Sequence, residues 1–98
     1  MSRKKWKEGT VQEFLELSDA DMALVEIKVS LAKALWRRRK TAKMTQLELA
    51  TAMHTSQSRV ARIEAGDPSV STDLVLRAMF TIGITPREIG RCIATPAK

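Results

Sequence analysis

The residues best suited to chemistry lie close together, between Gln46 and Glu64, in the sequence QLELATAMHTSQSRVARIE. If the end of this segment is helical, its outer face presents the hydrogen-bonding side chains of Gln57, Ser58 and Arg62. A glutamine amide can donate and accept a pair of hydrogen bonds at the edge of adenine, and an arginine guanidinium can donate a pair to guanine. Each such pair discriminates between bases by roughly 1–3 kcal/mol. This face therefore has the chemistry needed to read a base sequence.

Other kinds of chemistry find little support in the sequence. Cys92 is the only cysteine and His54 the only histidine, so one chain can assemble neither a disulfide framework nor a Cys/His metal cluster. There is no glycine-rich phosphate loop and no Ser/His/Asp arrangement. We therefore expect no enzymatic activity, no metal and no cofactor, and we interpret His54 as a turn residue.

Positive charge is concentrated in the middle of the chain. The formal net charge is +6, and residues 28–65 alone carry nine basic groups against two acidic ones. A polyanion is therefore expected to bind there. No stretch is apolar enough to span a bilayer, and the basic start MSRKKWKEGT lacks the apolar region of an export signal. We expect a cytoplasmic protein without a membrane segment.

Apolar periodicity and helix-capping signals predict an all-α protein without strands. The longest predicted helix covers residues 19–43 and is apolar over a wide arc, so it should be covered on two sides. Trp36 falls on one of its apolar rows and is expected in the core. Helices are predicted at residues 11–17, 19–43, 46–53, from 57 until Gly66-Asp67-Pro68, from 71 or 72 to 82, and from 85 onward.

The third and fourth helices of this set, joined by His54-Thr55-Ser56, have the proportions of a helix-turn-helix whose second helix enters the major groove. The sequence here resembles the XRE family, the Cro and phage-repressor type of helix-turn-helix, from about residue 31 to 89. The matching motifs are T-Q-x-x-L-A at 45–50, S-Q-x-x-V-x-x-I-E-x-G at 56–66, and an arginine-rich segment at 37–39 before them. The family usually has glycine where His54 stands, because that residue tends to be left-handed.

The resemblance implies a lambda-repressor-like five-helix DNA-binding bundle with an N-terminal helical extension. It also implies base contacts by Gln57, Ser58 and Arg62, and a structural ion pair between Arg39 and Glu64. Helix N-termini attract phosphates, and basic side chains add salt-sensitive attraction. The expected phosphate contacts are Gln46, Ser56, Arg59, Arg38 and Lys43.

Three regions follow from these observations. Residues 1–9 are expected to be a disordered basic tail, residues 10–27 a helical extension, and residues 28–94 the XRE-type domain. The extension is rich in apolar residues, so it either folds back on the domain or forms an interface with a second subunit or a partner. Because this motif usually reads paired half-sites as a two-fold dimer, we expect a homodimer on a palindromic operator.

The function predicted from the sequence is sequence-specific binding of double-stranded DNA by a transcriptional regulator that acts as a repressor. The segments VEIKVSLAKAL and EAGDPSVS resemble a branch of the family, the HigA-type antitoxins. That resemblance implies the autoregulating antitoxin of a type II pair, with a cognate toxin as partner. A free-standing regulator without a toxin stays open, as does a protein-interaction module that neutralises a toxin and binds DNA only secondarily. RNA binding is less favoured, because the four aromatic residues form no stacking platform.

Overall fold

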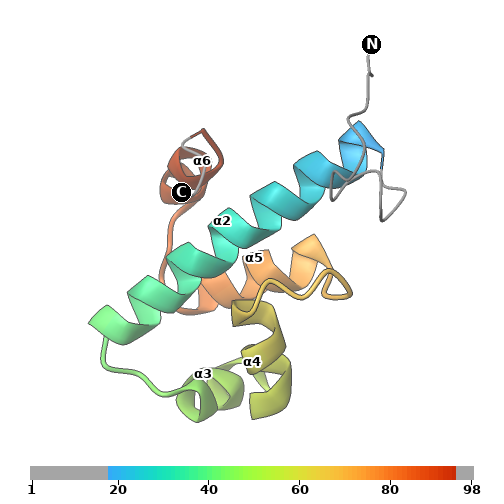
Figure 1. The fold of residues 1–98 in the computed structure, drawn as a ribbon. Helices are drawn as coiled ribbons and strands as arrows, with labels where there is room; N and C mark the ends of the chain where they lie inside the picture. Colours follow the sequence, from blue (N-terminus) through green and yellow to red (C-terminus); the bar gives the residue numbers. More distant parts are fainter. Residues whose placement is uncertain (1–17, 95–98) are drawn as a thin grey trace.

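Residues 18–94 are described by the structure, a computed structural model, and they form five α-helices with no strand among them (Figure 1). The prediction of an all-α bundle is therefore confirmed. The predicted helix at 11–17 and the predicted tail at 1–9 lie outside the described residues. The helices are α2 (Asp19–Thr41), α3 (Gln46–Met53), α4 (Gln57–Glu64), α5 (Thr72–Thr81) and α6 (Pro86–Ala94).

Local capping explains where the helices begin. At the start of α3, the Thr45 hydroxyl accepts a hydrogen bond from the backbone N–H of Glu48, and the Glu48 carboxylate accepts one from the N–H of Thr45. Ser18 and Asp21 form the same reciprocal box at the start of α2. Such boxes satisfy backbone donors that have no partner inside the helix.

Two helices end without the glycine that usually closes a helix. Lys43 after α2 and His54 after α3 have left-handed backbones, with φ of 59° and 58°. In each case the left-handed residue and the residue after it donate their backbone N–H groups back to the helix: after α2, Lys43 donates to the carbonyl of Lys40 and Met44 to that of Arg39. This Schellman geometry ends α2 at Thr41, two residues before the predicted position.

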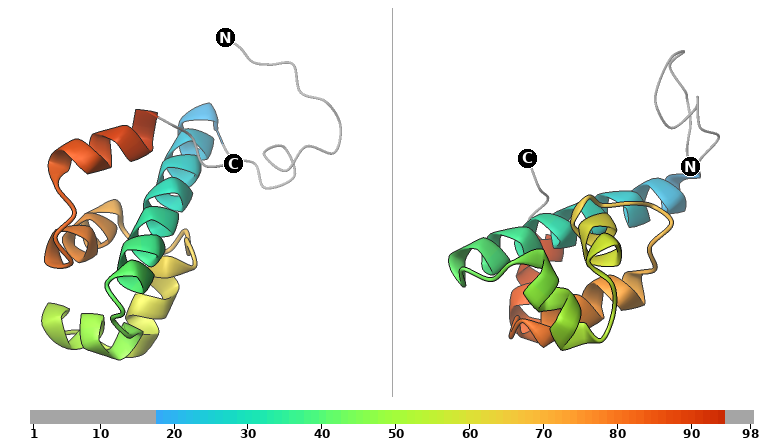
Figure 2. Two further views of the ribbon diagram at one scale, coloured as in Figure 1. Left: turned by 90° about the vertical axis from the view of Figure 1, so that its left-hand side faces the viewer. Right: turned by 90° about the horizontal axis from the view of Figure 1, so that it is seen from below.

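The long helix α2 supports the other four. Figures 1 and 2 show it crossing the molecule, with α6 against one side and α3 and α4 together near its C-terminal end. All its buried residues lie from Leu31 onward, so its first turns project beyond the bundle. The buried core draws on every helix and consists of Leu31, Leu35, Leu49, Ala50, Val60, Ile63, Val70, Val75, Ala78, Met79, Ile84 and Ile89.

The expectation that Trp36 lies in the core is wrong. Its side chain is 47% exposed, and the ammonium of Lys40 lies 5.7 Å from the ring centroid. The buried face of α2 is centred on Leu31, Leu35 and Arg39, which recur every fourth residue. Trp36 lies outside this row, and about half of its surface is left in contact with solvent.

Candidate DNA-binding surface

The helix-turn-helix consists of α3, the connection 54–56 and α4. Leu49 and Ala50 of α3 and Val60 and Ile63 of α4 are all fully buried. Removing these side chains from water contributes roughly 25 cal/mol per Å² of apolar area, which fixes one helix against the other. The small Ala50 allows the two backbones to approach closely.

The opposite side of α4 faces solvent. Its first turn is capped by Ser56, whose hydroxyl accepts a hydrogen bond from the N–H of Arg59 at 3.2 Å. The side chains of Gln57, Ser58, Arg59 and Arg62 are all exposed. The structure therefore brings the three residues expected to contact bases onto one accessible face, with Ser56 and Arg59 beside them.

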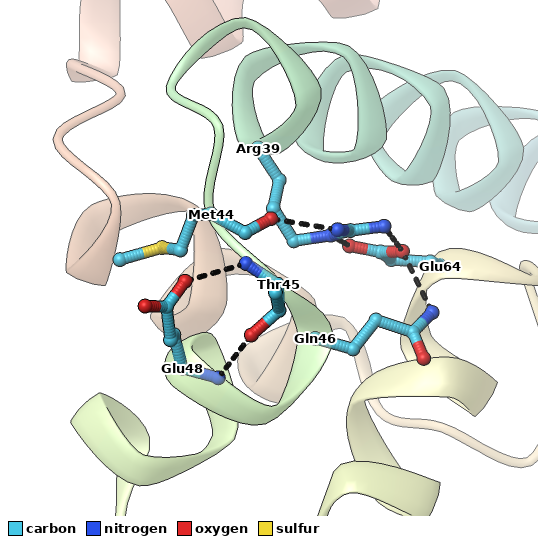
Figure 3. Close-up of polar contacts among 6 residues, drawn as sticks. All are labelled: Arg39, Met44, Thr45, Gln46, Glu48 and Glu64. Carbon is cyan, nitrogen blue, oxygen red and sulfur yellow. Dashed lines mark hydrogen bonds and ion pairs between the residues drawn. The ribbon is translucent and has the colours of Figure 1, made fainter.

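A largely buried polar cluster ties α2, α3 and α4 together (Figure 3). The guanidinium of Arg39 donates to both carboxylate oxygens of Glu64, from Nε at 2.5 Å and from Nη2 at 2.9 Å. It also donates to the carbonyl of Met44 at 2.8 Å. The hydrogen bonds to Glu64 raise the pKa of Arg39 above its ordinary value, against the opposing effect of burial. The charge of this pair is thus enclosed and fully hydrogen-bonded.

Gln46 joins the same cluster. Its side-chain amide donates from Nε2 to Oε1 of Glu64 at 3.0 Å, so Glu64 accepts from two different helices (Figure 3). This contact was not anticipated, because sequence spacing alone cannot show that α3 begins beside the end of α4. It leaves the Gln46 carbonyl oxygen turned away from Glu64 and fixes the orientation of the amide.

An open hollow of about 450 Å³ lies beside the cluster. Lys40 and Lys43 of the α2 end, Gln46 at the start of α3 and Gln57 at the start of α4 contribute to its lining. Two lysines and the first residues of two helices therefore line one concavity, which favours an anion such as a backbone phosphate.

Arg38, also expected to contact phosphate, does not line this hollow. Its guanidinium makes an ion pair with the Glu88 carboxylate of α6, and both side chains are about one-third exposed, at 32% and 33%. The Glu88 carboxylate also accepts a hydrogen bond from the backbone N–H of Thr85 at 2.9 Å. This hydrogen bond is the main reason why the pKa of Glu88 lies below its ordinary value. The structure thus places Arg38 in a contact that holds α6 against α2.

The sequence did not predict the roles of two residues at the segment after α4, Asp67 within it and Lys28 of α2 against it. Asp67 lies 3.8 Å from Nε of Arg62, and Lys28 of α2 donates to the backbone carbonyls of Pro68 and Val70. The Asp-Pro-Ser sequence signals a turn, but nothing in it shows which side chain its carboxylate faces.

Among residues 18–94 no helix is long and apolar enough to cross a membrane, and no three potential metal ligands gather in one place. The family model described as helix-turn-helix matches residues 37–89, which is more than half of the chain. Neither a search of curated proteins nor one of solved structures returned a match. The matched range contains α3, the connection and α4, and with them the exposed face described above. The chain therefore belongs to the helix-turn-helix family, of the XRE type, and is a DNA-binding transcription regulator.

Proposed function

We propose that the protein is a repressor that reads double-stranded operator DNA with the exposed face of α4. The observation that carries the proposal is the division of this eight-residue helix into two sides. Val60 and Ile63 are fully buried, while Gln57, Ser58 and Arg62 are exposed. A helix held in this way can enter a major groove with its polar face toward the base edges.

Phosphate contacts are proposed around that face. Ser56 and Arg59 lie at the start of α4, and Gln46 and Lys43 line the hollow next to it. Phosphate contacts fix the register of the protein on the duplex, and base contacts supply the specificity. Arg38 is proposed as a weaker contributor, because its guanidinium already pairs with Glu88.

We further propose that two copies bind a palindromic operator. Paired half-sites about one helical turn apart are the usual target of this motif. Residues 10–27 are the proposed interface with the second copy or with a protein partner. In the described part of this region, Leu24 is 51% exposed on the projecting end of α2, and Met22 and Val25 beside it are only partly buried; this group of apolar side chains supports a partner there.

An antitoxin role is the second candidate. It is favoured by the resemblance of the segments VEIKVSLAKAL and EAGDPSVS to HigA-type antitoxins and by the exposed Leu24. A toxin bound on this end of α2 would leave the face of α4 free, so neutralisation and autoregulation could coexist. A neighbouring gene for a small RNA-cleaving toxin, whose product co-purifies with this protein, would support the role. A Leu24→Asp variant that binds the toxin as well as the wild type does would show that this end of α2 is not the toxin-binding surface.

The DNA-reading proposal is tested with duplexes that the wild-type protein selects from a random pool. The Gln57→Ala, Arg62→Ala double variant is expected to lose at least about thirtyfold in affinity, because two base-contacting pairs at roughly 1 kcal/mol each are the minimum loss. Arg91→Ala, an exposed arginine of α6, serves as the control and is expected to bind almost as the wild type. Full affinity in the double variant would refute the assignment.

Salt dependence separates DNA reading from pure protein interaction. If several basic side chains replace counterions along the duplex, the logarithm of the association constant falls linearly and steeply with the logarithm of salt concentration. An affinity for the selected duplex that does not change with salt would contradict the proposed phosphate contacts.

A further inference from the structure

The turn that follows α4 is organised around one carboxylate, that of Asp67. Its Oδ1 accepts two hydrogen bonds from Ser69, from the backbone N–H at 2.9 Å and from the hydroxyl at 2.8 Å. Its Oδ2 lies 3.8 Å from Nε of Arg62. The backbone N–H of Asp67 also donates to the carbonyl of Arg62 at 3.2 Å. One oxygen of the carboxylate therefore holds the turn, and the other faces the arginine.

This turn is itself fixed to the long helix. Lys28 of α2 donates from Nζ to the carbonyl of Pro68 at 3.0 Å and also to that of Val70, which is buried. Gly66 lies against Val29, so a side chain added there would meet Val29 at 3.5 Å. The turn that carries Asp67 is thus held in place by contacts that do not involve the Arg62 side chain, and its carboxylate can act as a fixed charge beside a more exposed side chain.

The geometry determines which part of the guanidinium stays available. Arginine has five N–H donors arranged as a planar fork, and Asp67 faces the Nε side of that fork in Arg62. The two terminal nitrogens remain free, and they are the donors that a guanine edge accepts in a bidentate pair. The Arg62 side chain is 59% exposed, so DNA can reach these nitrogens.

We propose that Asp67 is a positioning residue that makes Arg62 a reader of bases rather than an anchor for phosphate. The inference rests on the proposed function of α4 and assigns the role of one residue in it. A carboxylate next to the guanidinium weakens its attraction for an anionic phosphate and repels that phosphate directly. A guanine edge carries no net charge, so the carboxylate weakens its hydrogen bonds with the terminal nitrogens far less than it weakens a phosphate contact. Asp67 therefore lowers affinity for DNA of any sequence and raises the preference for the operator.

Asp67→Asn is the direct test, because it keeps Oδ1 for the Ser69 contacts and replaces only the oxygen that faces Arg62. Affinities are measured for a duplex selected by the wild-type protein and for a scrambled duplex of the same composition. We expect the variant to bind the scrambled duplex about two- to fivefold tighter, the range that corresponds to losing one exposed ion pair. We also expect its salt dependence on that duplex to steepen by about one counterion. The preference for the selected duplex should fall by a similar factor.

Asp73→Asn is the matched control, since Asp73 is an exposed carboxylate of α5 that forms no ion pair with Arg62, and its loss changes the net charge equally. The Asp67→Asn change is also made in an Arg62→Ala background, where its effect on preference should vanish. If the asparagine variant unfolds, the measurement is repeated with Asp67→Ser, whose hydroxyl can still accept a hydrogen bond within the turn.

The outcomes distinguish the inference from the function on which it rests. If Arg62→Ala weakens binding to the selected duplex but Asp67→Asn behaves like Asp73→Asn, the inference is overturned and the proposed function stands. The inference is also overturned if the effect of Asp67→Asn persists without Arg62. If Arg62→Ala binds the selected duplex as the wild type does, the proposed role of Arg62 fails, and the role of Asp67 fails with it.

Discussion

Replacing Arg39 with methionine tests the contribution of the buried cluster to the stability of the whole domain. The side chains of Arg39 and Glu64 are only 9% and 4% exposed. Without the guanidinium, the Glu64 carboxylate loses two of its three hydrogen bonds and keeps only the one from Gln46. Hydrogen bonds to charged groups contribute about 1.5–3 kcal/mol each, and breaking a buried ion pair costs about 3–5 kcal/mol. We therefore expect Arg39→Met to lower the free energy of unfolding by about 3–5 kcal/mol.

The assay is urea unfolding followed by far-ultraviolet circular dichroism. In thermal unfolding, 3 kcal/mol corresponds to a fall in Tm of more than about 10 °C for a domain of this size. Arg38→Met is the control, because the pair of Arg38 with Glu88 is partly exposed and should contribute at most about 1 kcal/mol. The double variant Arg39→Met, Glu64→Leu should be more stable than Arg39→Met alone, since no carboxylate is then left buried without its partner. A loss below about 1 kcal/mol in Arg39→Met, or a double variant no more stable than it, would refute this reasoning.

Three further predictions concern local features, each measured by urea unfolding. His54→Gly should raise the free energy of unfolding by up to about 1 kcal/mol, because glycine adopts the left-handed backbone without strain; the control Ala52→Gly, inside α3, should lower it by about 1 kcal/mol. Trp36→Ala should cost clearly less than Leu35→Ala, for which about 2–5 kcal/mol is expected; equal losses would mean that Trp36 is in the core after all. The pKa of Glu88 is lower in the folded state than in the unfolded state. The stability that its carboxylate contributes is therefore present above the unfolded pKa of about 4.3 and is lost as the pH falls through the folded pKa. The free energy of unfolding of Glu88→Gln should consequently fall less on acidification than that of the wild type.

Local sequence signals predicted the helix boundaries well. Thr45 and Ser56 cap α3 and α4 as expected, because a capping hydroxyl acts on backbone groups only two or three residues away. The inward positions of the helix-turn-helix were equally readable. Leu49, Val60 and Ile63 stand at helical spacing in short helices that bury one side only, and all three are fully buried.

Features that depend on which helices pack against each other could not be predicted from local sequence in the same way. Trp36 stands on an apolar row, but only the positions of the neighbouring helices decide how far around α2 the core extends. The pairing of Arg38 with Glu88 joins residues fifty positions apart, and no local signal distinguishes Arg38 from Arg37 beside it. Lys43 closes α2 in a conformation that favours glycine, so propensity alone placed the helix end too late.

The way in which α4 is held bears directly on how it would read DNA. An isolated helix of eight residues is unstable in water, so α4 depends on contacts outside itself. Its first turn is held by the Ser56 cap, and its middle by two buried apolar side chains. At its last residue, Glu64 joins the buried cluster, and Asp67 faces Arg62 just beyond. Because these supports come from α2, α3 and the following turn, a substitution behind the helix should shift the proposed base-reading side chains without touching DNA. Weakened operator binding in Arg39→Met, under conditions where that variant is still folded, would be the signature of this coupling.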